Sequence, residues 1–337
     1  MGEVTTVGLD IGKRVLQVHG ADAQGRKVLQ RKLRREEVRA FFAALPPCLV
    51  GMEACATAHH WARELRALGH DVRLIPPAYV KPYVVRQKND AADAAAICEA
   101  VTRPNVRTTP VKTAEQQAAR VIHRTHELLS RQRVTLINAI RGHMAEFGVL
   151  APAGPQHVAP LIERIADPQT PIPSAAREAL NVLADQLVAL SRQVDRLEAG
   201  MRRRCREDAD AERLLTIPGV GPITASAILA GVPDMGGFRS GRDFGAWLGL
   251  VPRQSSSGGK DRLGRITKMG DRTIRRLLVT GALSVIRWAR SKPGFGESWL
   301  GRLVAKKPLK LAAVALGNKT ARIVWAVLSR GEAYRAA

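Results

Sequence analysis

Two short apolar runs near the start of the chain each end in an acidic residue. TVGLD ends at Asp10 and has the two-residue alternation of a β-strand, and CLVGME ends at Glu53. Asp90 and Asp93 lie three residues apart in the alanine-rich stretch KNDAADAAAICEAV, which favours a helix and places both on one helical face. Four carboxylates brought together from these elements repel one another. Hard divalent cations such as Mg²⁺ relieve that repulsion because they prefer carboxylate and water oxygens. The pattern makes phosphodiester chemistry the first hypothesis.

Residues 1–111 alternate strand and helix signals. After the first strand, GKRVLQVHGAD and GRKVLQRKL predict two more strands, and REEVRAFFAAL predicts a short amphipathic helix. CLVGME then predicts a strand, HHWARELRALG a helix that ends at Gly69, and DVRLIPP a further strand. A three-stranded meander followed by alternating helix and strand is typical of an RNase H-like fold. The predicted class is therefore α/β for this part and α for the rest.

The middle of the chain, residues 112–207, predicts two long helices. A charged helix runs from about Thr113 to Phe147, and the Pro/Gly-rich segment APAGPQHVAP ends it. Beyond Pro173 the apolar positions step alternately by four and three, which is a heptad seam typical of a coiled coil. These positions are Ala176, Leu180, Leu183, Leu187, Leu190, Val194, Leu197 and Met201. The seam can pack on the preceding helix or on another subunit; packing within the chain is the simpler expectation.

Positive charge is concentrated towards the C-terminus. The 337 residues carry 53 Lys and Arg against 30 Asp and Glu, a formal net charge of +23. Residues 251–330 hold 18 basic and 3 acidic side chains, so 18 − 3 = +15 of that charge lies there. Composition bias towards arginine does not explain such localisation, whereas a nucleic-acid partner does.

Cysteine usage and hydropathy predict a cytoplasmic protein. The four cysteines have neither CxxC nor zinc-ligand spacing, as expected in a reducing compartment. We expect no signal peptide, and Lys310, Lys319 and Arg322 interrupt the apolar stretch 309–328, so we expect no membrane partner.

Residues 208–337 open with a glycine motif between two apolar helical stretches. In ERLLTIPGVGPITASAILA, Gly219 and Gly221 have the spacing of a helix-hairpin-helix, whose backbone N–H groups hold a DNA phosphate. A turn with a purely structural role is the alternative.

A serine-rich segment follows, in which SSSGGK is surrounded by basic residues. Alone it suggests a flexible loop. A serine hydroxyl becomes an effective nucleophile when a base, a metal or positive charge assists it, and cations can hold the attacked phosphate. No histidine lies nearby, so no general base is visible. The candidate nucleic-acid contacts here are Arg253, Lys260, Arg262, Arg265, Lys268, Arg272, Arg275 and Arg276.

Taken together, these motifs resemble a known family. Asp10, Glu53 and KNDAADA, followed by IPGVGPITA and GLVPRQSSSGGKDRLGRITKMGDRTIRR, resemble the DEDD transposases of the IS110 insertion-sequence family, most closely its IS1111 branch. The resemblance covers nearly the whole chain, and the middle helices are its least specific part. It implies an N-terminal RuvC-like domain (1–111), a coiled-coil middle (112–207) and a C-terminal transposase domain with a nucleophilic serine (208–337).

The resemblance also implies roles for individual residues. Asp10, Glu53, Asp90 and Asp93 correspond to a tetrad that binds Mg²⁺ or Mn²⁺. The family serine precedes a glycine in the arrangement Pro, four residues, Ser-Gly, which Pro252 and Gly258 place at Ser257. The adjacent Ser255 and Ser256 remain competitors, and only the spacing separates them.

The implied reaction is strand exchange between donor and target DNA through a transient phosphoserine. It further implies a guide (bridge) RNA and a homo-oligomer, a dimer or tetramer, in which the metal and serine halves come from different subunits. No RNA-recognition motif is present to support the guide. A nucleoid-associated location follows from these partners.

Two other functions stay open. The tetrad alone suits a metal-dependent nuclease of the Holliday-junction-resolving type that acts by hydrolysis. The glycine motif and basic tail alone suit a non-catalytic DNA-binding protein, in which Asp90 is a helix N-cap and Asp93 a first-turn residue favoured by the helix dipole.

Overall fold

The computed structural model describes residues 3–84, 89–232 and 234–335. It divides into two compact units, residues 1–117 and 118–337, which are treated separately below.

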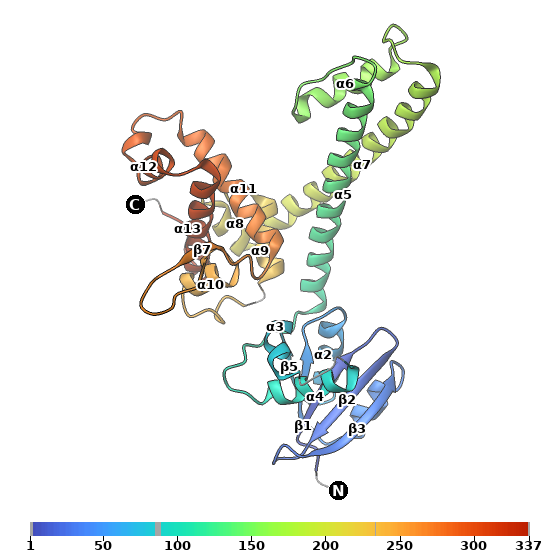
Figure 1. Ribbon diagram of the computed structural model, residues 1–337, viewed down its shortest axis with the longest axis vertical. Helices are drawn as coiled ribbons and strands as arrows, with labels where there is room; N and C mark the ends of the chain where they lie inside the picture. Colours follow the sequence, from blue (N-terminus) through green and yellow to red (C-terminus); the bar gives the residue numbers. More distant parts are fainter. Residues whose placement is uncertain (1–2, 85–88, 233, 336–337) are drawn as a thin grey trace. The chain divides into compact units, whose positions relative to one another are not determined.

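The first unit is built on a mixed five-stranded sheet (Figure 1). Strands β1 to β3 form an antiparallel meander, and β4 and β5 continue the sheet parallel to β1, in the order β3-β2-β1-β4-β5. The strands are β1 (Thr6–Ile11), β2 (Val15–Ala21), β3 (Lys27–Arg34), β4 (Leu49–Glu53) and β5 (Asp71–Ile75). This confirms the predicted α/β class and is consistent with an RNase H-like domain.

Helices cover both faces of this sheet. The alternate side chains Val7 and Leu9 of β1 face a core shared with Phe42 of α1 and Leu65 of α2, and all four are fully buried. On the opposite face, α4 packs across β1, β2 and β4. The helices of this unit are α1 (Val38–Ala43), α2 (Ala58–Ala67), α3 (Pro77–Val80), the short 3₁₀ helix η1 (Lys81–Tyr83) and α4 (Asp90–Val101).

The second unit begins with two long helices that pack on each other. They are α5 (Ala114–Ala145), whose first turn crosses the unit boundary, and α7 (Ser174–Arg206), with η2 (Pro155–His157) and α6 (Val158–Ala166) between them. Ile140 and Met144 of α5 share an apolar core with Leu180 and Leu187 of α7. Val194 and Met201, further along the heptad seam, are also buried. These seam positions therefore pack within the chain.

The rest of the second unit is helical around a separate core, which includes Phe244, Leu248, Ile274 and Val324. Its helices are α8 (Ala209–Leu215), α9 (Pro222–Gly231), α10 (Gly241–Trp247), α11 (Arg272–Ala289), η3 (Phe295–Glu297), α12 (Trp299–Lys306) and α13 (Leu309–Arg330).

Two features of this part bear on the sequence predictions. The serine segment, whose alternative was a flexible loop, forms an antiparallel hairpin of β6 (Pro252–Gln254) and β7 (Leu263–Ile266). Helix α13 is long and apolar enough to cross a membrane, but it packs against α10 and α11 and buries Ala312, Ala321 and Val324. These contacts give its apolar composition a role in the protein core.

Candidate functional site

Asp10 and Glu53 lie at the same edge of the sheet. In the parallel pair of β1 and β4, Leu9 lies opposite Met52, so the next residue on each strand is one of the two acids. Both side chains are half-buried. The sheet itself therefore brings together two carboxylates that are 43 residues apart in the chain.

Helix α4 brings the other two carboxylates to this edge. Asn89 caps its first turn by accepting a hydrogen bond from the Ala92 N–H at 2.8 Å, and Asp90 and Asp93 both lie in that turn. The alternative in which Asp90 is the N-cap is therefore wrong, because Asn89 has that role. Asp90 is exposed and Asp93 is half-buried.

Asp10 experiences the negative charge of the other three acids. The pKa of Asp10 is raised from 3.8 to about 6, first by burial and then by the negative charges of Asp93, Asp90 and Glu53. Carboxylates that repel one another in this way suit a divalent cation, whose charge would reverse the shift. In the described part of the chain, however, no three acidic, histidine or cysteine side chains are already arranged as a ligand set. The four acids fit a divalent cation by their chemistry, and three of them lie near enough to Asp10 to raise its pKa.

The serine hairpin presents its tip to solvent. The Ser255 N–H donates to the Arg262 carbonyl at 2.9 Å, and the Lys260 N–H donates to the Ser257 carbonyl at 3.1 Å. Gly258 and Gly259 turn the chain with φ of 57° and 73°, a backbone region that favours glycine. The residue before this glycine pair is Ser257, the predicted nucleophile, and its side chain is exposed.

The neighbouring serine has a carboxylate partner that the sequence interpretation missed. The Ser256 hydroxyl donates to Asp261 Oδ1 at 3.0 Å, and Gln254 Nε2 donates to both, at 3.1 and 3.2 Å. The hydroxyl of Ser257 makes no such bond within the described residues. Asp261 is the only acidic residue between Pro252 and Gly270, which is the signal that could have identified it.

Close backbone contacts fix the base of the hairpin to the end of α10. A Cβ on Gly270 would lie 1.9 Å from the Trp247 carbonyl oxygen, and one on Gly249 would lie 2.3 Å from the Met269 nitrogen. The Arg275 guanidinium donates to the Leu248 and Met269 carbonyls at 2.8 and 2.6 Å. The predicted DNA contact Arg275 thus has a bracing role in this structure.

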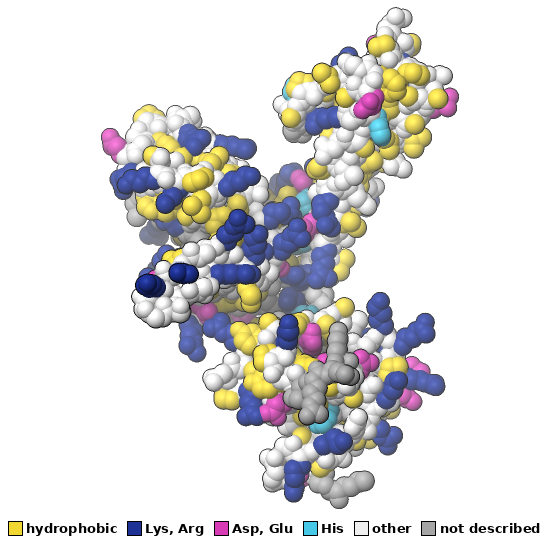
Figure 2. All heavy atoms as spheres, in the orientation of Figure 1, with side chains coloured by type: hydrophobic (Ala, Val, Ile, Leu, Met, Phe, Trp, Pro, Cys, Tyr) yellow, Lys and Arg dark blue, Asp and Glu magenta, His cyan; other side chains and the backbone are white. Residues whose placement is uncertain are grey.

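The other predicted cations lie at the surface, and Figure 2 shows Lys and Arg side chains gathered over this part of the second unit. Arg276 is 3.7 Å from Glu127 of α5. The remaining ones are all exposed: Arg253, Lys260, Arg262, Arg265, Lys268 and Arg272. An anionic backbone that approached the hairpin would therefore meet several solvent-facing cations.

The glycine motif forms a helical hairpin between α8 and α9, as predicted. A Cβ on Gly281 of α11 would lie 1.9 Å from the Gly219 carbonyl oxygen, so this turn packs directly on α11. Gly219 has φ of 84° and so has a structural reason to be glycine. Gly221, the N-cap of α9, is exposed, which leaves the start of that helix open to an anion.

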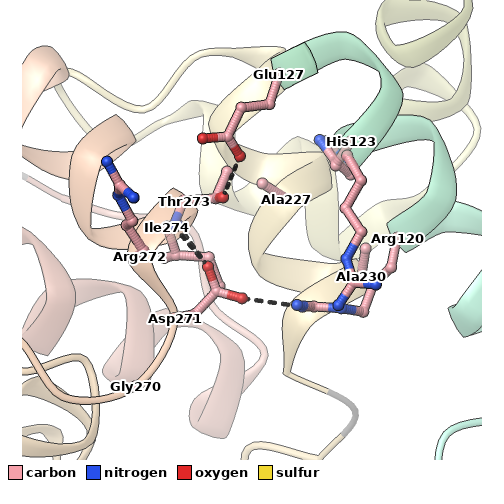
Figure 3. Close-up of a pocket in the computed structure, with 11 residues that line it drawn as sticks. Arg120, His123, Glu127, Ala227, Ala230, Gly270, Asp271, Arg272, Thr273 and Ile274 are labelled. Carbon is pink, nitrogen blue, oxygen red and sulfur yellow. Dashed lines mark hydrogen bonds and ion pairs between the residues drawn. The ribbon is translucent and has the colours of Figure 1, made fainter. Parts of the chain in front are cut away.

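A polar pocket of about 310 Å³ lies beside the start of α11 (Figure 3). Asp271 caps α11 through the Thr273 and Ile274 N–H groups and pairs with Arg120 of α5 at 3.0 Å. Thr273 Oγ1 donates to Glu127 Oε2 at 2.7 Å. Sequence reasoning did not find this cluster, because Arg120 and Asp271 are 151 residues apart.

The pKa shifts of Asp271 and His123 in this pocket follow from their burial and their hydrogen-bond partners. Burial alone would raise the pKa of Asp271, but the Ile274 N–H and the Arg120 guanidinium hold it below its ordinary value. Burial lowers the pKa of His123 to about 4, so this imidazole is neutral at pH 7 and pairs with Ser226 Oγ at 2.9 Å. Because most of these groups satisfy one another, the pocket mainly fixes α11 against α5 and α9.

Comparison with known proteins agrees with this arrangement. Residues 7–148 match a transposase family model of the IS110 DEDD type, and residues 211–296 match the model described as the transposase IS116/IS110/IS902 family. The first match contains all four acids, and the second contains the glycine motif and the serine hairpin.

Three curated relatives cover almost the whole chain. The chain is 49% identical to a probable family 20 transposase of Pseudomonas aeruginosa, over 98% of this chain and 99% of that protein. It is 38% identical to the transposase for insertion sequence element IS1328 of Yersinia enterocolitica, over 99% of both chains. It is 36% identical to the transposase for IS1111A of Coxiella burnetii, over 99% of this chain and 92% of that one. The chain therefore belongs to the IS110 family of insertion-sequence transposases, within its IS1111 branch.

Proposed function

We propose that this transposase exchanges DNA strands through a serine nucleophile, with a divalent cation held by its four N-terminal acids. One observation carries the proposal: Asp10, Glu53, Asp90 and Asp93 act electrostatically on one site. The same chain presents an exposed serine hairpin among solvent-facing cations. A protein that only binds DNA has no need to gather four acids.

The acids would supply the metal half of the reaction. Mg²⁺ or Mn²⁺ bound by Asp10, Glu53, Asp90 and Asp93 would neutralise charge on the attacked phosphate. Asp10, whose pKa is raised to about 6, must be deprotonated to take part.

The hairpin would supply the nucleophile. The Ser257 Oγ attacks a DNA phosphorus, its P–O bond forms, and the bond to the 3′ oxygen breaks to leave a free 3′ hydroxyl and a 5′-phosphoserine. The proton of Oγ passes to a base, and the leaving oxygen takes up a proton. A 3′ hydroxyl of the second duplex then attacks the phosphoserine and releases the enzyme, so the bond energy is conserved without ATP. The exposure of Ser257 and its cationic neighbours Lys260 and Arg253 support this role.

Ser256 is the second candidate nucleophile. Its hydroxyl donates to Asp261, a carboxylate that could take its proton, and this observation alone favours it. The same bond occupies the hydroxyl within the hairpin, whereas Ser257 is open to a substrate.

The partners belong to the same proposal. Donor and target DNA are the substrates, the family resemblance suggests a guide (bridge) RNA, and the enzyme acts in the cytoplasm on the nucleoid. Exposed apolar side chains on α5, at Val121, Leu128 and Val134, support association into a homo-oligomer. Such an assembly would let the acids of one subunit act with the serine of another.

A hydrolytic nuclease is the alternative, and it is favoured by the fact that all four acids lie in a unit that does not contain the serine hairpin. Such a nuclease would need only the four acids and the cation that they bind.

The deciding experiment traps the covalent intermediate. Full-length enzyme is incubated with Mg²⁺, end-labelled DNA carrying the joined ends of its own element, target DNA and the transcript of the element's non-coding end. Denaturing gels then report labelled protein. We expect Ser257→Ala to lose the adduct and keep DNA binding, whereas the matched variants Ser255→Ala and Ser256→Ala retain the adduct. Cleavage by Ser257→Ala without any adduct would establish the nuclease instead.

A further inference from the structure

A second hollow, of about 440 Å³, is lined by residues of α12 and α13. One wall is Trp299, the first residue of α12, and the other is a stripe along α13. Ala315, Asn318, Arg322 and Ala326 follow one another along that stripe at helical spacing. The small side chains of Ala315 and Ala326, at the two ends of the stripe, leave room for the hollow, whose volume is in the range of small-molecule sites.

Trp299 is 44% exposed, and backbone contacts fix its position at the start of α12. Ser298 caps α12 by accepting from the Gly301 N–H at 2.9 Å. A Cβ on Gly301 would lie 1.9 Å from the Phe295 carbonyl oxygen, so the start of α12 is pressed against the preceding turn. The Lys319 ammonium lies 4.9 Å from the centroid of the indole ring. An exposed indole at a fixed backbone position, with a cation over its ring, can stack on another planar ring.

Asn318 contributes unmet hydrogen-bonding capacity to the same hollow. Its Oδ1 is buried and accepts no hydrogen bond within the part of the chain that the structure describes. A buried polar atom without a partner is costly. A Cβ on Gly245 of α10 would lie 2.6 Å from this oxygen, so α10 closes over it. Rotation about the last torsion of the side chain would turn the oxygen away from α10 and toward the hollow, where a donor group of a ligand could bond to it.

The two charged residues that line the hollow, Lys319 and Arg322, are both positive. Lys319 and Arg322 are exposed, and neither makes an ion pair within the described residues. Between Trp299 and Arg330 the sequence contains seven basic residues and no acidic one. An anion bound next to the ring would therefore meet no like charge from α12 or α13.

We propose that this hollow binds one unpaired nucleobase together with its flanking phosphate. Trp299 stacks on the base, the Asn318 carboxamide meets its hydrogen-bonding edge, and Lys319 and Arg322 hold the phosphate. Single-stranded DNA and single-stranded RNA share this chemistry. The inference rests on the proposed function only in that the ligand is nucleic acid, and it requires no strand exchange.

Fluorescence anisotropy with the full-length protein tests it. The probes are labelled 12-mers of thymidine (dT12) and of uridine (U12), a DNA 12-mer of the same charge with every base removed, and a 12-base-pair duplex. We expect Trp299→Ala to weaken binding of dT12, U12 or both by about 5- to 150-fold, the range for loss of one base stack. Binding of the abasic strand and of the duplex should not change. Loss with dT12 alone identifies DNA as the source of the base, and loss with U12 alone identifies RNA.

Two variants keep the test specific. Trp288→Ala removes another exposed indole, with Lys292 4.6 Å from its ring centroid, that does not line the hollow, and it should bind as the wild type does. Trp299→Phe keeps a ring and should retain more base-dependent affinity than Trp299→Ala. Unchanged binding of dT12 and U12 by folded Trp299→Ala overturns the proposal, as does an equal loss with the abasic strand or with Trp288→Ala. Failure to form a protein–DNA adduct would leave this result untouched.

Discussion

Gly8 of β1 lies directly opposite Gly51 of β4, and α4 packs closely against the sheet at this glycine pair. A Cβ on Gly8 would lie 2.1 Å from the Ala94 carbonyl oxygen, and one on Gly51 would lie 2.7 Å from Val101 Cβ. Because side chains alternate along a strand, the face that carries the two glycines also carries Asp10 and Glu53 two residues later. The close packing of α4 at the two glycines therefore also brings Asp90 and Asp93 of α4 to the face that carries Asp10 and Glu53.

The first prediction follows from this contact. Gly8→Ala would force α4 off the sheet against backbone atoms, so we expect a loss of about 1–3 kcal/mol or more in the free energy of unfolding. We also expect metal-dependent activity to be lost, because α4 carries two of the acids. Urea denaturation of the full-length protein measures the first effect. Gly200→Ala on α7, where an added Cβ meets nothing within 4 Å, is the matched control and should be neutral or slightly stabilising. Equal stability of Gly8→Ala and the wild type would contradict the close packing of α4 against Gly8.

The second prediction concerns pH. The pKa of Asp10 is raised from 3.8 to about 6, so its protonated form favours the folded state, and that contribution is lost as pH rises through about 6. We therefore expect Asp10→Asn to raise the melting temperature of the protein in EDTA at pH 8 and to leave it nearly unchanged at pH 4. Asp71→Asn, at an exposed position paired with Arg73, is the control without this effect. A shift of the same size at both pH values would show that repulsion among the acids is not its cause.

The third prediction uses the same carboxylate with metal present. Protons compete with a cation for Asp10, so saturating Mg²⁺ should raise the melting temperature of the wild type more at pH 8 than at pH 5. Asp10→Asn and Asp93→Asn should show little of this stabilisation at either pH. Differential scanning fluorimetry measures it, and strand transfer that persists in EDTA would argue against a metal role.

The sequence predicted elements where the pattern is local. The strands of the meander and the long helices α5 and α7 have a hydrophobic periodicity that can be read from the sequence without knowledge of the tertiary structure. It did not predict the β6–β7 hairpin, because these strands have only three and four residues, nearly all of them exposed, and so show no alternation of buried and exposed side chains. The four acids were identified from the sequence, but the close packing of α4 at Gly8 and Gly51 that brings them together was not. Asp261, Arg120 and Asn318 gained their roles from partners distant in the chain or from burial, neither of which one sequence displays.

The fourth prediction separates the two serines. Asp261→Asn weakens the hydrogen bond to Ser256 and leaves Ser257 untouched, because among the described residues the Asp261 carboxylate bonds to Ser256 and Gln254 but not to Ser257. If Ser257 is the nucleophile, the variant should retain most of the protein–DNA adduct seen on denaturing gels. An adduct as fully absent as in Ser257→Ala would assign the chemistry to Ser256, with Asp261 as its base.

The fifth prediction concerns the unpaired oxygen of Asn318. Replacing a buried polar atom that has no partner with an apolar group of similar shape removes a penalty of about 1–3 kcal/mol. Leucine branches at the same carbon as asparagine, so we expect Asn318→Leu to raise the free energy of unfolding, measured in urea, by about 1 kcal/mol. The same change at Asn181, an exposed position on α7, removes no such penalty and should stay within about 0.5 kcal/mol of the wild type. A clear loss of stability in Asn318→Leu would mean that the oxygen already has a partner. A gain would show that the chain tolerates a polar group which folding alone does not favour, as expected for a group kept for binding a ligand.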